Sequence, residues 1–331
     1  MLIIASTTYL SSKLPRYLLS IVEMDFRQLS ALVAVADHKS FSAAARALHT
    51  VQSNISTHVA RLERELDVTL VERRSGDLTA EGTAVVRRAR IIRSELQSID
   101  SDVSALRDEI SGEVRCGMIG TSARWLLPRL LELLDDRFED LRLITVDATT
   151  TSLVPLVADS QLDLALVQTP IDHPDIATVA CFEEEAIVLA PIDHELAQHD
   201  LIDMETLSQH RVLIPPPGIA FRNVIDKAAE RAAVELTIRA EVDGMRLLAS
   251  LAFQGFAPAI VPTTAAPLGF QTETKRVRLS GMDRRSVGIA TSRRTTLSAP
   301  ALAVQELLFE LIATAAPDQP GVYVAGELAK R

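Results

Sequence analysis

One segment of the sequence concentrates the side-chain types that read base edges in DNA. Residues 51–66 (VQSNISTHVARLEREL) begin with small amides and hydroxyls, and apolar Ile55, Val59, Leu62 and Leu66 follow at steps of 4, 3 and 4. This spacing predicts a helix with one buried stripe. Gln and Asn can bond adenine in two places, Ser and Thr can reach bases or phosphates, and Arg neutralises phosphates. The candidate DNA-binding residues are Gln52, Ser53, Asn54, Ser56, Thr57, Arg61, Arg73 and Arg74.

The neighbouring segments are those that would position such a reading helix. Residues 41–49 (FSAAARALH) predict a short helix capped by Ser40, and its alanines allow a second helix to cross closely. Two short helices joined by a tight turn describe a helix-turn-helix. Residues 70–82 predict a two-stranded wing, with Thr79 capping the helix that follows. An ordinary helix pair with a solvated face is the alternative, although long charged residues are commoner on such faces.

The charge of the chain is unevenly distributed. The net charge is −10, but residues 24–93 hold 11 Lys/Arg and 8 Asp/Glu, a net of +3. Residues 94–331 hold 21 Lys/Arg and 35 Asp/Glu, a net of −14. Because an acidic body repels a polyanion, only the N-terminal block is expected to touch nucleic acid.

A long apolar seam follows the wing. Its residues step alternately by 4 and 3, which predicts a coiled-coil-like helix over 80–110 that pairs two chains. A long helix packed on its own subunit is the alternative. The seam consists of Val85, Ala89, Ile92, Leu96, Ile99, Val103, Leu106 and Ile110.

Beyond Gly112 the pattern alternates between strands and helices, which indicates doubly wound α/β layers in two similar halves. Candidate strands are residues 114–119, 141–146, 162–167, 186–190, 212–214, 237–242, 259–261, 277–279 and 286–290. Candidate helices are residues 124–137, 152–160, 219–234, 244–254 and 299–313. The segments near 186–190 and 277–290 can cross between the halves.

Ligands of such folds bind in the crevice at the carboxyl ends of the strands. Loops with hydroxyl side chains are predicted at this crevice, and these loops directly precede helices. Helix N-termini attract anions. For any single loop, ordinary helix capping is the alternative, but several aimed at one crevice favour a small organic anion, a carboxylate, as effector. The candidate effector-binding residues are Thr121, Ser122, Thr149, Thr150, Thr151, Gln168, Pro217 and Arg222.

Catalysis has weaker support in the sequence. Residues 172–175 and 193–194 contain Asp and His without metal-ligand spacing, so solvated loops are the better interpretation. The sequence has no nucleophile elbow, Walker loop or dinucleotide fingerprint. Cys116 and Cys181 lie in or beside apolar strands, which favours buried structural thiols over a redox pair. We therefore expect no enzyme activity, no cofactor and no metal.

Residues 24–82 resemble the winged helix-turn-helix of the LysR-type transcriptional regulators. The matching segments are FRQLSALVAVADHKSFSAAARALHTVQSNIS, VARLERELDVTLVERR and LTAEG, in that order. The resemblance continues to about residue 313 through an effector domain similar to periplasmic binding proteins. Val51 stands where the family often has Ser, so Thr50 is expected to take over capping, and the wing looks shorter than in the family.

The expected fold is multidomain: an all-α winged helix-turn-helix N-terminal domain, a long linker helix, and an α/β C-terminal domain of two Rossmann-like subdomains. The expected boundaries are a disordered extension over 1–23, the DNA-binding domain over 24–82, the linker over 83–111, the effector domain over 112–315 and a mobile tail over 316–331. Within the effector domain, subdomain I takes 112–186 and 288–315 and subdomain II takes 187–287.

These features predict a LysR-type, ligand-responsive regulator that binds a double-stranded DNA operator as a homodimer or homotetramer. Its other expected partner is the small organic effector, with RNA polymerase as a further candidate. No apolar run reaches the ~18 residues of a membrane span, so a cytoplasmic location without membrane contact is expected. The alternative is a small-molecule-binding protein or enzyme whose N-terminal helices merely dimerise it and which has no specific DNA target.

Overall fold

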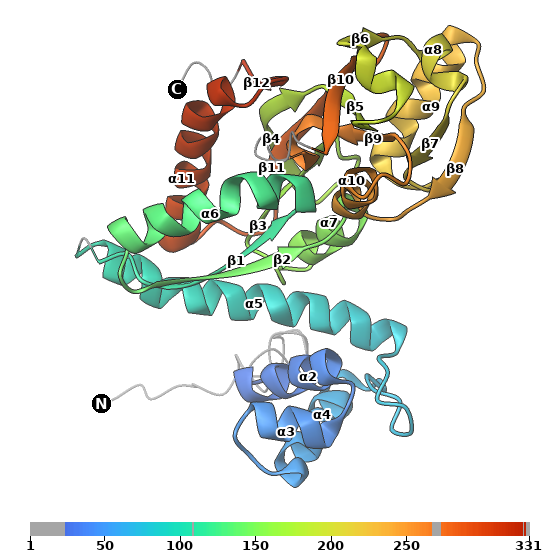
Figure 1. Cartoon of the computed structure of the whole chain (residues 1–331). Coiled ribbons are helices and arrows are strands. Elements are labelled where there is room, and N and C mark those ends of the chain that lie inside the picture. Colours follow the sequence, from blue (N-terminus) through green and yellow to red (C-terminus); the bar gives the residue numbers. More distant parts are fainter. Residues whose placement is uncertain (1–23, 108, 267–272, 327, 329–331) are drawn as a thin grey trace, which may run out of the picture. The chain divides into compact units, whose positions relative to one another are not determined.

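The computed structural model of the chain describes residues 24–107, 109–266, 273–326 and 328 (Figure 1). The extension expected over 1–23 lies outside the described residues. Contacts divide the chain into two compact units, one up to Leu96 and one from Gln97 onward. Each unit has its own core and is described by itself.

The N-terminal unit is a three-helix core followed by a wing. Leu32, Ile55 and Leu62 are fully buried where the helices meet, and Ser40 accepts a hydrogen bond from the Ala43 amide, so the predicted cap is confirmed. The helices are α2 (Phe26–His38), α3 (Phe41–Ala47) and α4 (Gln52–Leu66).

The wing is a tight loop closed by one bridge rather than a hairpin of two strands. Val71 pairs with Leu78, and the Gly82 amide donates to Thr79 Oγ1 at 2.9 Å, which confirms the predicted cap of the next helix. A side chain at Gly82 would place its Cβ 2.0 Å from the Leu70 carbonyl oxygen, so only glycine lets the helix pack this close to the wing.

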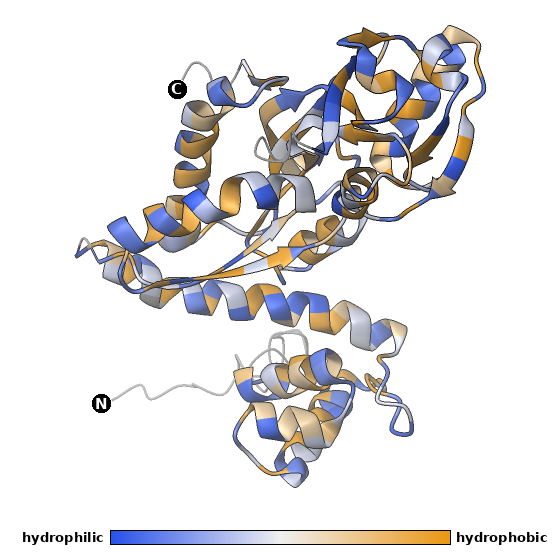
Figure 2. Cartoon of the chain, viewed as in Figure 1, coloured by the Kyte–Doolittle hydropathy of each residue, from blue (hydrophilic) through white to orange (hydrophobic). Residues whose placement is uncertain are grey.

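The seam residues lie on one long helix, α5 (Ala80–Ala105). Figure 2 shows hydrophobic and hydrophilic residues alternating along it. The helix ends five residues before the predicted residue 110. There the Ser104 carbonyl oxygen accepts the Arg107 amide at 2.9 Å, an i+3 turn in place of a further helical bond. Ile92, Leu96, Ile99 and Val103 all remain exposed on α5.

The C-terminal unit contains two six-stranded sheets, each the centre of a lobe. In lobe I the strand order is β12-β4-β11-β3-β1-β2, with β1, β2 and β3 parallel and β11 antiparallel to its neighbours. Its strands are β1 (Gly112–Met118), β2 (Leu141–Asp147), β3 (Leu164–Thr169), β4 (Ile176–Glu184), β11 (Arg285–Ser292) and β12 (Val322–Val324). Its helices are α6 (Gly120–Arg137), α7 (Thr150–Ala158) and α11 (Ala299–Ala315), with the short η3 (Ala316–Asp318) after them.

Lobe II repeats this plan around the order β6-β10-β5-β9-β7-β8. Its strands are β5 (Ala186–Pro191), β6 (Leu201–Ile202), β7 (Arg211–Ile214), β8 (Thr237–Glu241), β9 (Ala259–Pro262) and β10 (Thr274–Leu279). Its helices are α8 (Met204–Ser208), α9 (Ala220–Ala232) and α10 (Met245–Phe253), with the short η1 (Glu195–Gln198) and η2 (Thr263–Ala265). The chain crosses between the lobes from β4 to β5 and returns from β10 to β11.

The stretch Ala299–Asp318, which is α11 and the following turn, is long and apolar enough to cross a membrane by length and composition. Val304, Leu308 and Ile312 of α11 are fully buried in the core of lobe I, against α6 and β1. This burial is typical of the core helix of a globular lobe.

The segment after α11 is ordered into the fold, although the sequence predicts a mobile tail from residue 316. β12 pairs with β4 of lobe I, and the Gly321 carbonyl oxygen accepts the Glu185 amide at the crossing. Pro320 offers its carbonyl oxygen to Thr263 Oγ1 of lobe II at 2.8 Å. Residues 319–324 therefore form a strap that bonds to both lobes; its short, mixed sequence gives no periodicity from which a strand could be predicted.

We predict that deletion of residues 319–331 lowers the free energy of unfolding by about 2–4 kcal/mol, because the chain then lacks the stabilisation that comes from burying the side chains of Val322 and Leu328. Urea unfolding followed by fluorescence of the single tryptophan, Trp125, measures this loss. Tyr323→Phe, which removes only the exposed bond to Glu185, should cost less than about 1 kcal/mol. A truncated chain as stable as the full one would show that the strap contributes nothing.

Candidate nucleic-acid interface and ligand pocket

The N-terminal end of α4 presents an open polar surface. Gln52, Ser53, Asn54 and Thr57 are exposed there and Ser56 is half-buried. The helix begins after Val51, and no side chain caps it. Its first amide groups are therefore free to meet phosphate oxygens, which favour helix N-termini.

Two of these side chains are held by neighbours. Ser42 Oγ of α3 donates to Gln52 Oε1 at 2.7 Å, which leaves the amide group of Gln52 free to donate. Asn54 Nδ2 donates to Thr50 Oγ1 at 3.0 Å. Thr50 thus accepts from a side chain and does not cap α4, so the capping role expected for it is wrong.

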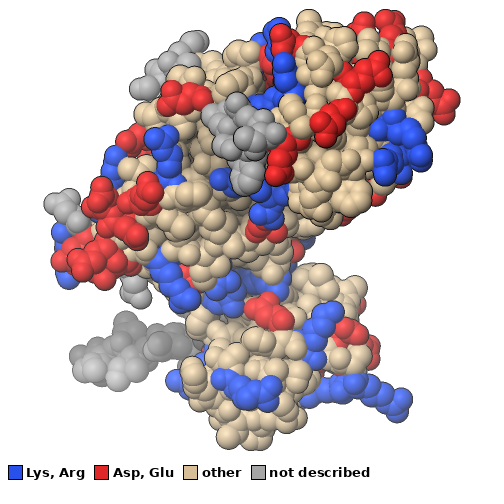
Figure 3. Space-filling view, in the orientation of Figure 1, with Lys and Arg blue, Asp and Glu red and all other residues tan. Residues whose placement is uncertain are grey.

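The arginines of this unit differ in whether they form ion pairs with carboxylates. Arg61 pairs with Glu65 one turn along α4. Arg73 pairs with Glu63 at 2.8 Å and lies over the Phe41 ring. Arg74 has no ion-pair partner among the described residues. Figure 3 shows several patches of Lys and Arg with fewer Asp and Glu on the visible face of this unit, whereas the C-terminal unit carries clusters of both charges.

Glu63 is a positioning residue that sequence reasoning missed. Its Oε1 accepts the Leu70 amide at 2.9 Å and its Oε2 accepts Arg73, so it ties the wing to α4. The sequence places Glu63 simply on the polar side of a helix, and no local signal reveals that the wing returns to it.

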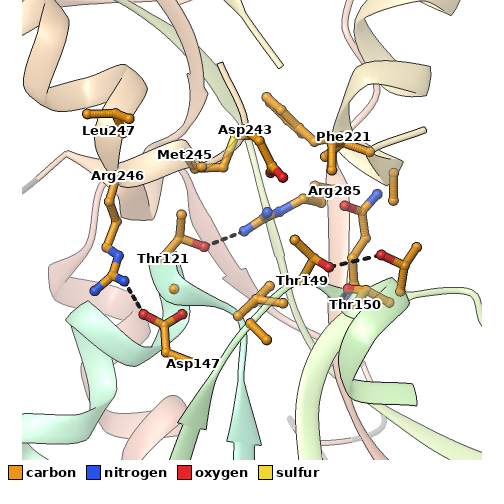
Figure 4. Close-up of a pocket in the computed structure, with 18 residues that line it drawn as sticks. Thr121, Asp147, Thr149, Thr150, Phe221, Asp243, Met245, Arg246, Leu247 and Arg285 are labelled. Atoms are coloured by element: carbon orange, nitrogen blue, oxygen red, sulfur yellow. Dashed lines mark hydrogen bonds and ion pairs between the residues drawn. The ribbon is translucent and has the colours of Figure 1, made fainter. Parts of the chain in front are cut away.

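The C-terminal unit contains a pocket of about 300 Å³ between its two lobes (Figure 4). Four helices begin at its wall: α6 and α7 from lobe I, and α9 and α10 from lobe II. In each case the residue before the helix and the first two helical residues line the pocket. No side chain caps any of the four helices, in contrast to α2, α3 and α8.

Hydroxyl groups line the lobe I side of this pocket. Thr150 Oγ1 accepts the Gln168 amide at 3.0 Å, which leaves its own proton free to donate. Thr149 Oγ1 lies 2.9 Å from Thr151 Oγ1. Five of the eight sequence-predicted residues therefore meet at one pocket: Thr121, Thr149, Thr150, Thr151 and Gln168.

The other three predicted residues do not line the pocket. Ser122 is fully buried inside α6, and Pro217 lies in an exposed turn. Arg222 pairs instead with Asp226 at 2.7 Å and with Glu241. Its guanidinium is thus neutralised outside the pocket.

Four charged side chains that the sequence did not single out line the pocket. Arg246 of α10 pairs across it with Asp147, at the end of β2. Asp243 lies just before α10, and Arg285 comes from the first residue of β11. Asp147 directly follows the predicted strand 141–146 and could have been noted. Arg285 lies more than a hundred residues further along the chain and reaches the pocket only where the chain crosses back to lobe I.

Arg285 belongs to a buried cluster at the crossing between the lobes. Its Nε donates to Glu184 Oε1 at 3.0 Å and its Nη2 to Thr121 Oγ1 at 2.8 Å. The other Glu184 oxygen accepts the Thr264 amide and hydroxyl. Glu184 is fully buried and Arg285 is 4% exposed, so each charge depends on the other for compensation.

Both cysteines are buried in the sheet of lobe I, as the sequence predicted. Burial raises the pKa of the Cys116 thiol to about 12, with a smaller contribution from Asp163. Among the described residues, no group of three or more His, Cys, Asp or Glu side chains is placed to hold a metal ion.

A helix-turn-helix head joined to a two-lobed α/β sensor defines a one-component transcription regulator. Residues 26–83 match the model of bacterial regulatory helix-turn-helix proteins of the lysR family, and residues 107–313 match the LysR substrate binding domain. The chain belongs to the LysR family. It is a DNA-binding regulator and not an enzyme.

Similar proteins agree with this assignment. The chain is 30% identical over 252 residues to a probable hydrogen peroxide-inducible genes activator of Streptomyces viridosporus, covering 75% of this chain and 80% of that protein. A full-length OxyR variant of Pseudomonas aeruginosa is similar in fold, with a TM-score of 0.71 at 24% identity, covering 88% of this chain and 95% of that one. The effector binding domain of QuiR in complex with shikimate matches with a TM-score of 0.56 at 18% identity, covering 62% and 98%.

We predict that Glu184→Gln destabilises the C-terminal unit by about 3–5 kcal/mol, because Arg285 keeps a buried charge without its partner. Trp125 packs edge-on against Phe182 in lobe I, so its fluorescence in urea reports this unfolding. The matched control is Glu183→Gln, an exposed neighbour 3.7 Å from Arg284, which should cost less than about 1 kcal/mol. Equal losses in the two variants would contradict the role given to Glu184.

Proposed function

We propose that this regulator binds an operator through α4 and the wing, and that a small organic carboxylate in the pocket between the lobes controls the outcome. The observation that carries the effector proposal is the convergence of four uncapped helix N-termini on one pocket. Such termini attract anions through free amides and the helix dipole. The proposed location of the protein is the cytoplasm, where its operator is.

The proposed DNA contacts divide by chemistry. Gln52, Ser53, Asn54, Ser56 and Thr57 lie at or near the open end of α4 and suit base edges and nearby phosphates. The arginines Arg61, Arg73 and Arg74 suit the phosphate backbone. Arg61 and Arg73 already have carboxylate partners, so they would have to exchange these for phosphate, whereas Arg74 is ready to bind.

The proposed assembly is a homodimer through α5. Ile92, Leu96, Ile99 and Val103 recur at heptad spacing and are each 43–55% exposed in the single chain. A second copy of the same helix would cover them, as in coiled coils. A dimer presents two reading helices to two half-sites of an operator.

The effector-binding residues in this proposal are Thr121, Thr149, Thr150, Thr151 and Gln168, together with Arg285. The carboxylate accepts hydrogen bonds from the amides at the helix ends and from the threonine hydroxyls, while the Arg285 side chain supplies positive charge beside Thr121. An effector shifts the regulator only if it binds one arrangement of the lobes more tightly than another. Ser122, Pro217 and Arg222, which the sequence also suggested, do not line the pocket and make no contact with the effector in this proposal.

The names of the peroxide-inducible relatives suggest another candidate, a response to peroxide through thiol oxidation. The two cysteines of this chain do not favour it. Cys116 of β1 and Cys181 of β4 are separated by β3 and β11, so at the usual spacing of strands they lie at least about 14 Å apart. A disulfide needs α-carbons within about 7 Å. Thiol oxidation also needs an accessible thiolate, and Cys116 is buried with a pKa of about 12.

We expect Gln52→Ala to weaken binding to the specific operator by about 1–3 kcal/mol, because its free amide no longer reaches a base. Binding to a scrambled duplex should stay unchanged. Fluorescence anisotropy at one salt concentration measures both, and Glu81→Ala at the start of α5 is a control for surface substitution. An equal loss on both duplexes would show that Gln52 does not read bases.

We expect Thr150→Val to weaken binding of the effector acid roughly 10- to 150-fold, because a hydroxyl donor to a carboxylate is lost. Calorimetry of the full chain with a panel of carboxylic acids identifies the acid and then measures the variant. Arg222→Lys is the matched control, since this arginine is paired outside the pocket, and it should respond as the wild type does. Normal affinity in Thr150→Val would remove the hydroxyl from the site.

A further inference from the structure

The pocket has two poles of different chemistry. Figure 4 shows Thr149, Thr150 and Phe221 on one side and Asp147 and Arg246 on the other. The first pole holds the starts of α7 and α9 and has hydroxyls but no acidic side chain. The second holds the start of α6 with Asp147 and Arg246, and Asp243 lies between the two sides, above Arg285 in the view of Figure 4. A ligand anion is therefore expected at the first pole only.

Two carboxylates of the pocket, Asp147 and Asp243, lie close to helix ends. A Cβ on Gly120 would come 2.9 Å from Asp147 Oδ1 and from Arg246 Nε, so this ion pair covers the start of α6. Asp243 directly precedes Gly244, the residue before α10, where φ is +121°. Among the described residues, no hydrogen bond or ion pair engages Asp243. Its oxygens can only accept, so a ligand group beside it has to donate.

The charges around the pocket limit the net charge of the ligand. Four helix ends at about half a positive charge each, with Arg246 and Arg285, provide about four positive charges. Asp147, Asp243 and Glu184 provide three negative charges. About one positive charge remains, which a single carboxylate balances. A second carboxylate would face Asp243, and an ammonium group would cancel the negative charge that the pocket needs.

We infer that the effector is a hydroxylated monocarboxylate, with its carboxylate at the starts of α7 and α9 and its hydroxyls donating to Asp243. This inference rests on the proposed function and names the chemical class within it. The pocket of about 300 Å³ is at the small end of ligand sites, which suits a molecule of one ring. Phe221, Met245 and Leu247 provide apolar surface for its carbon frame.

Matched acids test this inference on the full chain by calorimetry. Shikimate, quinate and 3,4-dihydroxybenzoate are each compared with the partner that lacks hydroxyls: 1-cyclohexenecarboxylate, cyclohexanecarboxylate and benzoate. At least one hydroxylated acid should bind at least tenfold more tightly than its partner. In Asp243→Asn the difference should shrink at least threefold, whereas Asp193→Asn, an exposed residue outside the pocket, should keep it.

The outcomes separate this inference from the proposed function. Equal affinity within every pair, or an unchanged difference in Asp243→Asn, would overturn the hydroxyl assignment and leave a carboxylate effector standing. Tighter binding of cyclohexane-1,4-dicarboxylate or of 4-aminocyclohexanecarboxylate would overturn the monoanion assignment. Binding of none of these acids at millimolar concentration would overturn the carboxylate effector itself.

Discussion

The buried ion pair between Glu184 and Arg285 is the constraint on which the C-terminal unit depends. Glu184 ends the strand that leaves lobe I and Arg285 begins the strand that returns to it, so the pair joins both crossings. It also reaches Thr264 in lobe II and Thr121 at the pocket. Removing either charge would leave the other buried, which is why the geometry of the crossing and that of the pocket wall are fixed together.

Uncapped helix N-termini appear at both surfaces where an anion is expected. α4 has none of the side-chain caps that begin α2 and α3, and the four helices at the pocket have none either. A cap would satisfy the same amides that a phosphate or carboxylate binds. The missing caps lower the stability of each helix slightly and keep both surfaces available for binding.

The sequence pattern predicted those features that depend on residues close together in the chain. The helix-turn-helix, most strands of both lobes and five pocket residues follow from periodicity and from hydroxyls at strand ends. β4 was missed because residues 176–184 mix exposed and buried positions without clean alternation. Arg285, Asp243 and Arg246 were missed, and Arg222 was preferred, because which arginine faces the pocket is decided by tertiary packing. In the sequence, Arg222 and Arg246 both simply follow a turn into a helix.

The strap formed by residues 319–324 has a practical consequence for anyone who handles this protein. It bonds to both lobes, and the side chain of Leu328, a few residues further along the chain, is buried. A purification tag or fluorescent protein inserted directly after residue 328 would therefore begin beside packed structure, near the junction that links the lobes. Labels are better attached at exposed positions elsewhere, so that a measured ligand response belongs to the regulator and not to its tag.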